Sequence, residues 1–484
     1  MSLSVAFNAA RSSLSSTSSQ IETTARNISG AGQAGTSRKI AITTTSGDGG
    51  ATVIKVTRAS DNALFMRMLS ATSSTADRQA VLDGLERLQA TVGDPESDAS
   101  PAARLGALTD YLEQYANTPD DPAIAAEVVV RAQDLATSLN AATATVHKVR
   151  TDTDAAMERS VGRVNDLLKQ FEVENTTVVR GTVRGADVTD ALDRRDSILA
   201  ALSEEMGVTA VTRGNNDMLI YTDSGATLFE TSPREVSFTR TAVLTAGMNG
   251  QSVMVDGVAV TGPDAPMPLR SGRLAGLAEL RDSTAVVFES QLDQMAQGLM
   301  QAFAEIDHSG GGGPDLPGLF TDGTATLPAS ATGAASRIAV NPALDPAQGG
   351  TPALLRDGGV NGADYEANTT DAASFADEIR RLQASVSALR SFDPAAEIGS
   401  SGSLAEFGTA SVGWLEGTRK AMSGKAEGEK ALLAHASAAL SDVTGINMDD
   451  EYARQLELER SFQASSKLIA IINELYDSLL QAVR

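Results

Sequence analysis

The sequence predicts a mainly α-helical protein with inserted β structure, in which a bundle of long helices is built from both ends of the chain. Two observations lead to this prediction. Apolar residues recur at alternating steps of four and three at both termini. The same alternation runs without proline for about fifty residues in the middle of the chain, which is typical of helices that pack along a narrow seam against partner helices.

Each terminal seam is a run of positions that face one side of a helix. At the N-terminus these are Leu3, Phe7, Ala10, Leu14, Ile21 and Ile28, with Thr17 and Thr24 at the remaining steps. At the C-terminus they are Leu458, Phe462, Ile469, Ile472, Tyr476, Leu479 and Val483, with Ser465 between them. Because such stripes need partner helices, we predict that both seams form an assembly interface shared with neighbouring copies of the chain.

Several seam residues are small, so the seams bury little apolar area. An isolated helix is only marginally stable in water, and ordering one residue costs about 1 to 2 kcal/mol. We therefore expect roughly the first and last forty residues to be mobile in the monomer and to fold on assembly.

The composition narrows the class of protein. The 484 residues carry a net charge of -23, which disfavours nucleic acid as a partner. The absence of cysteine excludes disulfides, thiolate zinc sites and cysteine nucleophiles. No apolar run is long enough for a transmembrane helix, so we expect no membrane insertion. The first residues also lack the basic and apolar regions of a secretory signal, so export would need another route.

Local signals divide the chain into elements. The first helix is expected to end near Ile28, before a glycine-rich turn, and a β-ribbon over Ile40–Thr45 and Thr52–Thr57 follows. Ser100 and Asp121 each precede a proline, which predicts a helix start at both places. The helix after Asp121 should run for roughly fifty residues, or about 75 Å.

Four domains are expected from these elements. The first is a terminal coiled-coil axial domain of residues 1–40 with 445–484, and the second is a long-helix bundle of 41–205 with 270–309 and 364–444. An inserted β domain covers 206–269, where runs of strand-like residues alternate with turns. A Gly- and Pro-rich insertion covers 310–363, and whether it belongs to the β domain stays open. Within the bundle, helical segments are expected at 276–307, 370–391 and 403–442.

One glycine pattern resembles a nucleotide-binding loop. Gly30, Gly32 and Gly35 have the spacing G-x-G-x-x-G. That fingerprint needs a strand before it and a helix after it, whereas here a helix precedes it and extended residues follow. We interpret it as a turn that ends the first helix.

The acidic and histidine side chains do not form a recognisable reactive site. Asp449, Asp450 and Glu451 follow Asn447, a good N-cap, and acids in the first turn interact favourably with the helix dipole. The histidines are His147, His308 and His435, and none has a partner at helical metal-binding spacing. We therefore expect a protein that is not an enzyme, with no catalytic residues, no cofactor and no metal site.

The two ends of the chain resemble a known group of proteins. Asn27-Ile28-Ser29 followed by Gly35-Thr36-Ser37-Arg38 is similar to the N-terminal signature of flagellar rod, hook and hook-associated proteins. In that group the stretch commonly reads Asn-Ile-Ala/Ser-Asn and then Gly-Tyr-Ser/Thr-Arg-Gln. This chain has Gly30 at the second asparagine, Thr36 at the tyrosine and Lys39 at the glutamine.

Further stretches resemble the FlgK family of hook-associated proteins, which join hook to filament. Ser441 to Glu451 is similar to the entry of that family's last helix. Two internal stretches, Asp190 to Asp196 and Gly272 to Asp282, are similar to its helical segments and occur in the same order. Such a protein assembles through coaxial packing of its N- and C-terminal helices after export by the flagellar type III apparatus, without a cleaved signal peptide.

The resemblance also implies partners and a location. It implies self-association in a helical or ring-like layer at the hook-filament junction, contact with the hook protein and the second junction protein, and a cytosolic chaperone on the C-terminal helix. Flagellin, the second junction protein and the hook protein are alternatives, because other flagellar axial proteins share helical ends. A coiled-coil adhesin or adaptor outside the flagellum would explain the long helices and the acidity, but not the family-like stretches.

Overall fold

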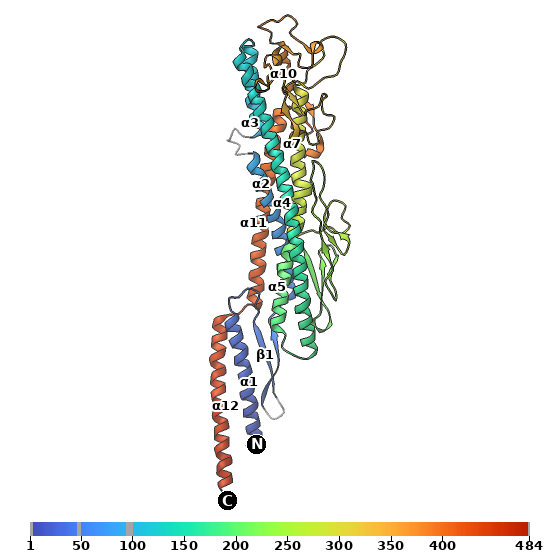
Figure 1. The fold of residues 1–484 in the computed structure, drawn as a ribbon. Coiled ribbons are helices and arrows are strands. Elements are labelled where there is room, and N and C mark those ends of the chain that lie inside the picture. The colour runs from blue at the N-terminus through green and yellow to red at the C-terminus, as the bar shows by residue number, and fades with distance from the viewer. Residues whose placement is uncertain (1–2, 46–49, 93–99, 483–484) are drawn as a thin grey trace.

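The computed structural model describes residues 3–45, 50–92 and 100–482, and it shows an elongated molecule with both termini at the same end (Figure 1). The helices are α1 (Leu3–Gly30), α2 (Asn62–Val92), α3 (Pro101–Asn117), α4 (Pro122–Val183), α5 (Thr189–Glu205), α6 (Arg273–Glu279), α7 (Ala285–Ala302), α8 (Ala334–Arg337), α9 (Leu354–Asp357), α10 (Asp377–Ser387), α11 (Leu404–Thr444) and α12 (Met448–Ala482). A π-helical turn over Leu280–Thr284 joins α6 to α7.

The strands form small antiparallel sheets within the described residues. β1 (Lys39–Thr45) pairs with β2 (Ala51–Arg58), β9 (Phe320–Thr321) with β10 (Ala339–Val340), and β11 (Arg390–Ser391) with β12 (Ser401–Gly402). One three-stranded sheet contains β3 (Val208–Thr212), β4 (Met218–Thr222) and β5 (Thr227–Phe229), and another contains β6 (Val236–Ser237), β7 (Met254–Val255) and β8 (Val258–Ala259). The predicted fold class, a helical core with small β inserts, is confirmed.

The longest helix starts where the sequence predicts. The Asp121 carboxylate caps α4 by accepting hydrogen bonds from the N–H groups of Ala123 and Ile124. The helix spans 62 residues, because its polar C-terminal part is covered by α5 and the neighbouring turn. Because of this length, several other helices and strands pack along α4.

The buried stripe of α4 departs from the predicted alternation in its second half. Met157 and Leu168 are buried, whereas Ala156 and Leu167, which the pattern selected, are only partly buried. From Val164 to Val178 the buried positions again alternate by four and three, through Leu168, Phe171 and Asn175. Two predicted positions were therefore off by one residue, whereas the alternation itself continues almost to the end of α4.

Two apolar cores lie along the long helices, which with their β inserts (residues 59–444) we call the rod. One core, near the end of the rod far from the termini, joins α3, α7 and α10 to α4 and includes Phe320 and Ile338 from the 310–363 segment. The other joins α5 and the strands of residues 208–259 to the opposite end of α4. The two β-containing segments therefore lie on different cores, while the domain boundaries expected from the sequence stay a prediction.

Two other expectations were wrong in extent. The helix expected over 370–391 is shorter, because residues 370–376 form turns and Arg390 and Ser391 pair with β12. The sequence pattern also favours Met66 and Met68 as core-filling residues, whereas they are only partly buried and line a cleft.

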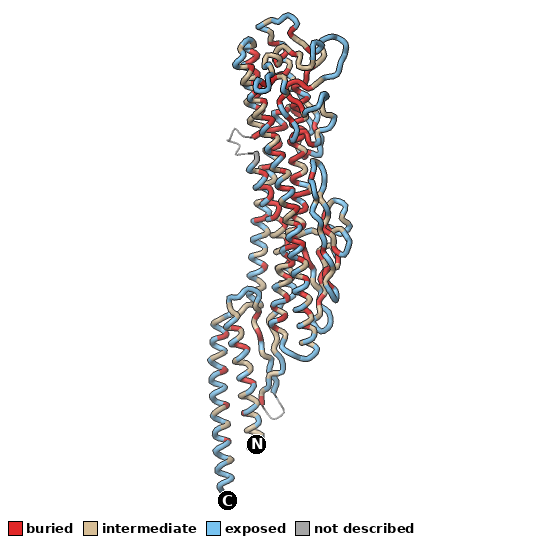
Figure 2. The backbone as a smooth tube through the Cα atoms, viewed as in Figure 1, coloured by how far each residue is buried: buried red, intermediate tan, exposed pale blue. Residues whose placement is uncertain are grey.

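The terminal unit, which consists of α1, α12 and the β1–β2 hairpin, projects from the rod. Within it, α1 packs against both α12 and the hairpin. Buried residues are dense along the rod and sparse along α12 (Figure 2). The two ends of the chain are thus brought together outside the main cores.

Candidate functional site

The two predicted seams face each other in the terminal unit, where α1 and α12 run antiparallel and side by side (Figure 1). Ala10 of α1 is buried, while Leu3, Phe7, Leu14, Ile21 and Ile28 are partly buried. In α12, Leu458 and Ile472 are buried, Ile469 and Tyr476 are partly buried, and Phe462 and Leu479 are exposed. Val483 lies outside the described residues.

The tightest part of the α1–α12 contact is made by small and polar side chains. Ala10, Thr17 and Thr24 are buried on α1, and Leu458, Ser465 and Ile472 are buried on α12. Each set is spaced by seven residues, so α12 buries only one position per heptad, although α1 also buries Ser16 and Thr23. The contact is therefore close but thin.

A second apolar stripe on α12 was not anticipated. Leu468, Ile471, Leu475 and Leu480 lie outside the predicted seam, and each is about half exposed or more. Leu468, Ile471, Leu475 and Leu479 lie on one face of the helix that the described residues leave uncovered, whereas Leu480 lies about 100° or more around the helix from each of them. If the seam pattern is started one residue earlier it selects Leu468, Ile471 and Leu475, so a search for two registers would have found most of this face.

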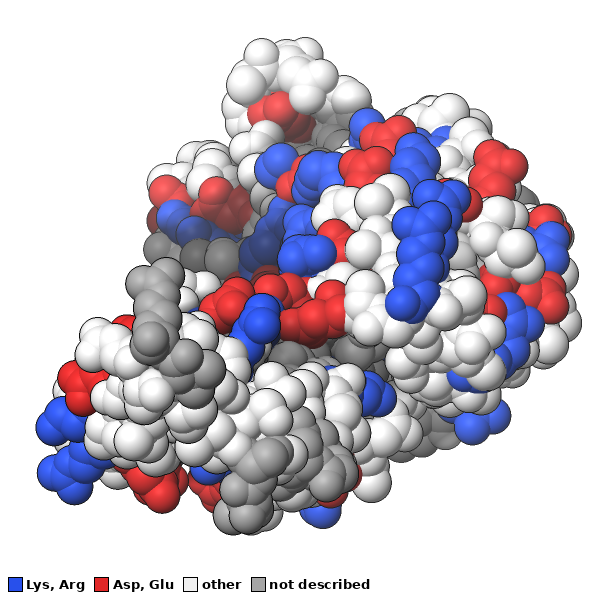
Figure 3. Space-filling model, turned by 90° about the horizontal axis from the view of Figure 1, so that it is seen from below, with Lys and Arg blue, Asp and Glu red and all other residues white. Residues whose placement is uncertain are grey.

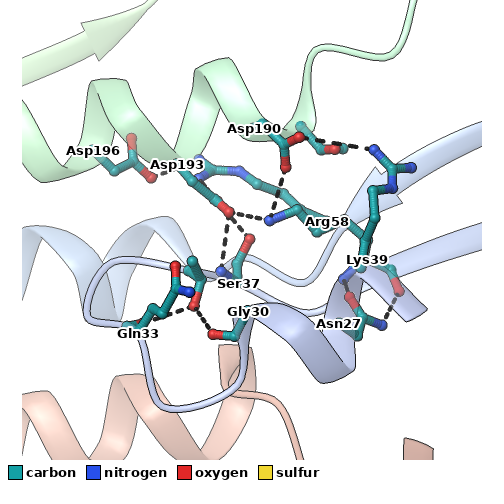
Figure 4. Close-up of polar contacts among 12 residues, drawn as sticks. Asn27, Gly30, Gln33, Ser37, Lys39, Arg58, Asp190, Asp193 and Asp196 are labelled. Carbon is teal, nitrogen blue, oxygen red and sulfur yellow. Dashed lines mark hydrogen bonds and ion pairs between the residues drawn. The ribbon is translucent and has the colours of Figure 1, made fainter. Parts of the chain in front are cut away.

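The loop after α1 is held to the rod by a buried aspartate, Asp193 of α5 (Figure 4). The carboxylate of Asp193 accepts hydrogen bonds from the Ser37 hydroxyl at 2.6 Å and from the Ser37 N–H at 3.1 Å. It also pairs with the Lys39 ammonium, and with the Arg58 guanidinium at 3.0 Å. Lys39 and Arg58 are register partners at the base of the hairpin, so one side chain binds both strands.

Further ion pairs extend this contact along α5. Its acidic residues are spaced by three and include Asp190 and Asp196, with Asp187 just before the helix. Arg58 donates to Asp196 at 2.6 Å, Lys39 lies 3.3 Å from Asp190, and Arg26 pairs with Asp187 at 2.9 Å. We call these aspartates, with Asp193, the acidic row. Viewed from below, acidic and basic side chains lie beside one another in a recess of the molecule (Figure 3).

The same loop is tied to α12. The Arg38 guanidinium donates to the buried carboxylate of Glu451 at 2.9 Å, and the Arg38 N–H donates to the Thr444 carbonyl. The Asn27 side chain exchanges two hydrogen bonds with the backbone of Lys39. The signature residues quoted from the sequence therefore connect α1, α5 and α12 at one joint.

The electrostatic environment differs between neighbouring aspartates. Burial alone would raise the pKa of Asp193, but hydrogen bonds from Lys39, Ser37 and Arg58 hold that pKa below its ordinary value. The pKa of Asp196 is raised by burial, which outweighs the nearby Arg58. Burial lowers the pKa of Arg195 to about 10. Asp193 is thus the firmly ionised centre of the joint.

A large cleft of about 1820 Å³ lies beside this ion cluster. One side is formed by the turn after α1 and by β2, including Ile54 and Lys55. The other side is formed by the start of α2, by α5 and by strands β3 and β4, including Phe65 and Met218. The terminal unit and the rod are therefore separated by open space next to the point where charges join them.

The features weighed as reactive sites have structural roles. Gly32 and Gly35 have positive φ angles in the turn that ends α1, and Asn447 accepts from the N–H of Asp449 as a helix cap. His147 lies 2.6 Å from Glu289, whose hydrogen bond raises the His147 pKa, so it is not a free surface residue. Among the described residues, none group as a metal site, and no helix is both long and apolar enough to cross a membrane.

Two family models match the chain. The flagellar hook-associated protein FlgK helical domain matches residues 68–318, from α2 to beyond α7. The C-terminal part of the flagellar basal body rod FlgEFG proteins matches residues 442–482, which contain α12. None of the curated proteins compared with the chain matches it.

One solved structure with a detected similarity is the flagellar hook junction protein FlgK from Burkholderia pseudomallei. The match has 21% identity and a TM-score of 0.43, and it covers 53% of this chain and 46% of that chain. It therefore spans less than half of the solved protein.

Proposed function

Because the chain belongs to the family of the flagellar hook-associated protein FlgK helical domain, whose model matches just over half of it, we propose that it joins hook to filament in the bacterial flagellum. Family membership supports a structural role in the flagellar axis. The position at the hook-filament junction is the more specific part of the proposal, and it would distinguish this chain from flagellin, the hook protein and the second junction protein.

The observation that carries the proposal is the exposed apolar stripe on the terminal helix pair. Leu468, Ile471 and Leu475 are each about half exposed to water in the free chain. Covering the remaining half of one such side chain is worth about 1 kcal/mol, so several copies packed through these stripes gain much more than one helix pair alone. This favours a coaxial layer of terminal helices over a solitary molecule.

The partners follow from the same surface. We propose self-association in a helical or ring-like layer, with the hook protein on one side and the second junction protein on the other. A cytosolic chaperone would cover the α12 stripe before type III export, because an exposed apolar face of this length favours aggregation. Catalysis has no part in this function.

Deletion of the gene tests the assignment directly. Hooks that end bare in electron micrographs, with filament protein shed into the medium, are the expected result. Missing hooks would point instead to a rod or hook component, and normal flagella would refute a flagellar role.

Complementation of the deletion tests the stripe. A chain carrying Ile471→Ser with Leu475→Ser should fail to restore filaments, although its rod folds normally. The matched control is Glu474→Gln, an exposed substitution on the same helix turn that leaves the apolar residues in place. Full motility with the double variant would separate the stripe from assembly.

A further inference from the structure

The terminal unit is attached to the rod by charge rather than by apolar packing. Among the described residues, neither apolar core of the rod includes a side chain of the terminal unit, in which α1 packs against α12 and the hairpin. Its side-chain contacts with α5 are the bonds of Arg26, Ser37, Lys39 and Arg58 to the acidic row. The chain itself crosses between the two parts at residues 59–61 and 445–447.

The strength of these bonds decreases away from Asp193. The Asp193 and Lys39 side chains are each only 7% exposed, so water and salt screen their pair weakly. The outer pairs of Arg26, with Asp187 at 2.9 Å and with Asp190 at 3.8 Å, leave about a third or more of each side chain exposed, so they contribute less than the buried pair. Breaking the central bonds would therefore release the contact, whereas breaking the outer ones would not.

The cleft gives the terminal unit room to move. It is lined by both parts, with Ile54 and Arg58 on the terminal side and Phe65, Met66 and Met218 on the rod side. Much of its lining is apolar, so closing it would bury surface that is now wet. Two bodies that share an open cleft and short connecting segments have the form of a hinge.

We propose that this joint is a hinge held open by the acidic row, with Asp193 as its latch. While Asp193 holds the base of the hairpin, the terminal unit has one orientation. When the latch opens, the terminal unit turns as a body about residues 59–61 and 445–447, and the cleft narrows. If the proposed junction role is correct, such a hinge would let identical copies fit two neighbours of different geometry.

The hinge can be measured in the free protein, because the chain contains no cysteine. Lys55→Cys and Val211→Cys place two spin labels at exposed positions on opposite sides of the cleft. Pulsed electron resonance then reports the distribution of distances between the labels. We expect one narrow peak in the otherwise native chain at low salt.

Opening the latch should change that distribution. In a chain with Asp193→Asn and Asp196→Asn, the fraction of molecules outside the native peak should rise on the order of threefold or more, mainly toward shorter distances. Raising the salt of the labelled native chain from about 0.05 M to about 1 M should move the distribution in the same direction, by a smaller amount. The control is Asp166→Asn, which removes an exposed pair with Lys169 and should change nothing.

The result that overturns the hinge is an unchanged narrow peak in the double variant while circular dichroism shows it folded. If the double variant does not fold, Arg58→Gln takes its place, because it removes the pairs with Asp193 and Asp196 from the terminal side, and an unchanged narrow peak in that folded variant overturns the proposal. Neither measurement involves the flagellum, so a wrong junction assignment would leave the hinge result standing.

Discussion

The most informative substitution in the rod is at Asp77, a buried carboxylate on α2. Its side chain is 5% exposed, and its Oδ1 atom has no hydrogen-bond partner. The Arg78 guanidinium, 3.4 Å from Oδ2, is the nearby cation. Burial raises the pKa of Asp77 to about 6 despite Arg78, and Glu279 and Glu429 raise it further.

Replacing this carboxylate by a neutral amide should stabilise the protein at neutral pH. The pKa of Asp77 rises from its ordinary value of 3.8 to about 6 in the folded protein. One pKa unit corresponds to about 1.36 kcal/mol, so keeping Asp77 ionised in the fold costs about 3 kcal/mol. We expect Asp77→Asn to recover up to about that amount near pH 7.

The sign of the pH dependence follows from the direction of the shift. Because the folded state binds the proton more tightly, protonation of Asp77 favours folding, and this contribution is lost as the pH rises through about 6. The gain from Asp77→Asn should therefore be largest at neutral pH and fall below about 1 kcal/mol near pH 4, where the native carboxyl is itself protonated in the fold.

Asp293 provides the matched contrast. Burial also raises its pKa to about 6, but its two oxygens accept the N–H groups of Gly333 at 2.6 Å and Ala335 at 2.9 Å. An asparagine can accept only one of these bonds and directs an NH₂ group at the other donor. Asp293→Asn should therefore give no gain, or a loss of about 1 to 3 kcal/mol.

Urea unfolding at two pH values measures both variants. The single tryptophan, Trp414, lies on α11, which packs against α2, so its fluorescence follows this part of the rod. A loss of stability in Asp77→Asn near pH 7, or a gain that does not change with pH, would refute the reasoning. An equal gain of stability in Asp293→Asn would show that the missing hydrogen-bond partner of Asp77 does not explain the expected difference between the two sites.

Three further predictions concern backbone and interface positions. Gly272→Ala should lower the free energy of unfolding by more than about 3 kcal/mol, because Gly272 has φ +93° and an added Cβ would lie 2.3 Å from the Met206 Cα. Gly185→Ala, at φ +68° with open space around it, should lower it by only about 1 kcal/mol, and urea unfolding compares the two variants. Gly428→Ala, in open space on α11, should raise the melting temperature by adding about 1 kcal/mol of helix stability. Ile472→Ala should weaken the α1–α12 contact by about 2 kcal/mol. In a hydrogen-exchange experiment the amides of α1 should then exchange roughly thirty-fold faster, while the amides of the rod should exchange at unchanged rates.

Much of the fold could be predicted because local signals decide it. The N-caps Ser100 and Asp121, each followed by proline, and the turn after Ile28 place helix ends within a few residues. The ribbon of β1 and β2 was also confirmed, although its turn at residues 46–49 lies outside the described residues. These features depend on short-range hydrogen bonding and backbone preference, which a sequence displays directly.

The joint could not be predicted, because it depends on contacts between distant residues. Asp193 lies more than 150 positions from Ser37 and Lys39, and nothing in its own neighbourhood indicates burial. A three-residue spacing of aspartates is normally interpreted as a solvated helix face. The signal that was available is the signature Gly35-Thr36-Ser37-Arg38. The Thr36 hydroxyl donates to the Gly30 and Gln33 carbonyls within the turn, whereas Ser37 and Arg38 bind residues outside it.

The distribution of side chains on α12 indicates which of its contacts are made within the chain and which await other molecules. It buries one side chain per heptad, namely Leu458, Ser465 and Ile472, while Leu468, Ile471, Leu475 and Leu479 are exposed. Because these four side chains are already about half buried, completing their burial would release roughly 3 to 6 kcal/mol, a large part of the stability of an ordinary domain. We therefore expect the free energy of this helix to be lowest in an assembly, and the proposed hinge would let the terminal unit reorient until these apolar side chains are covered.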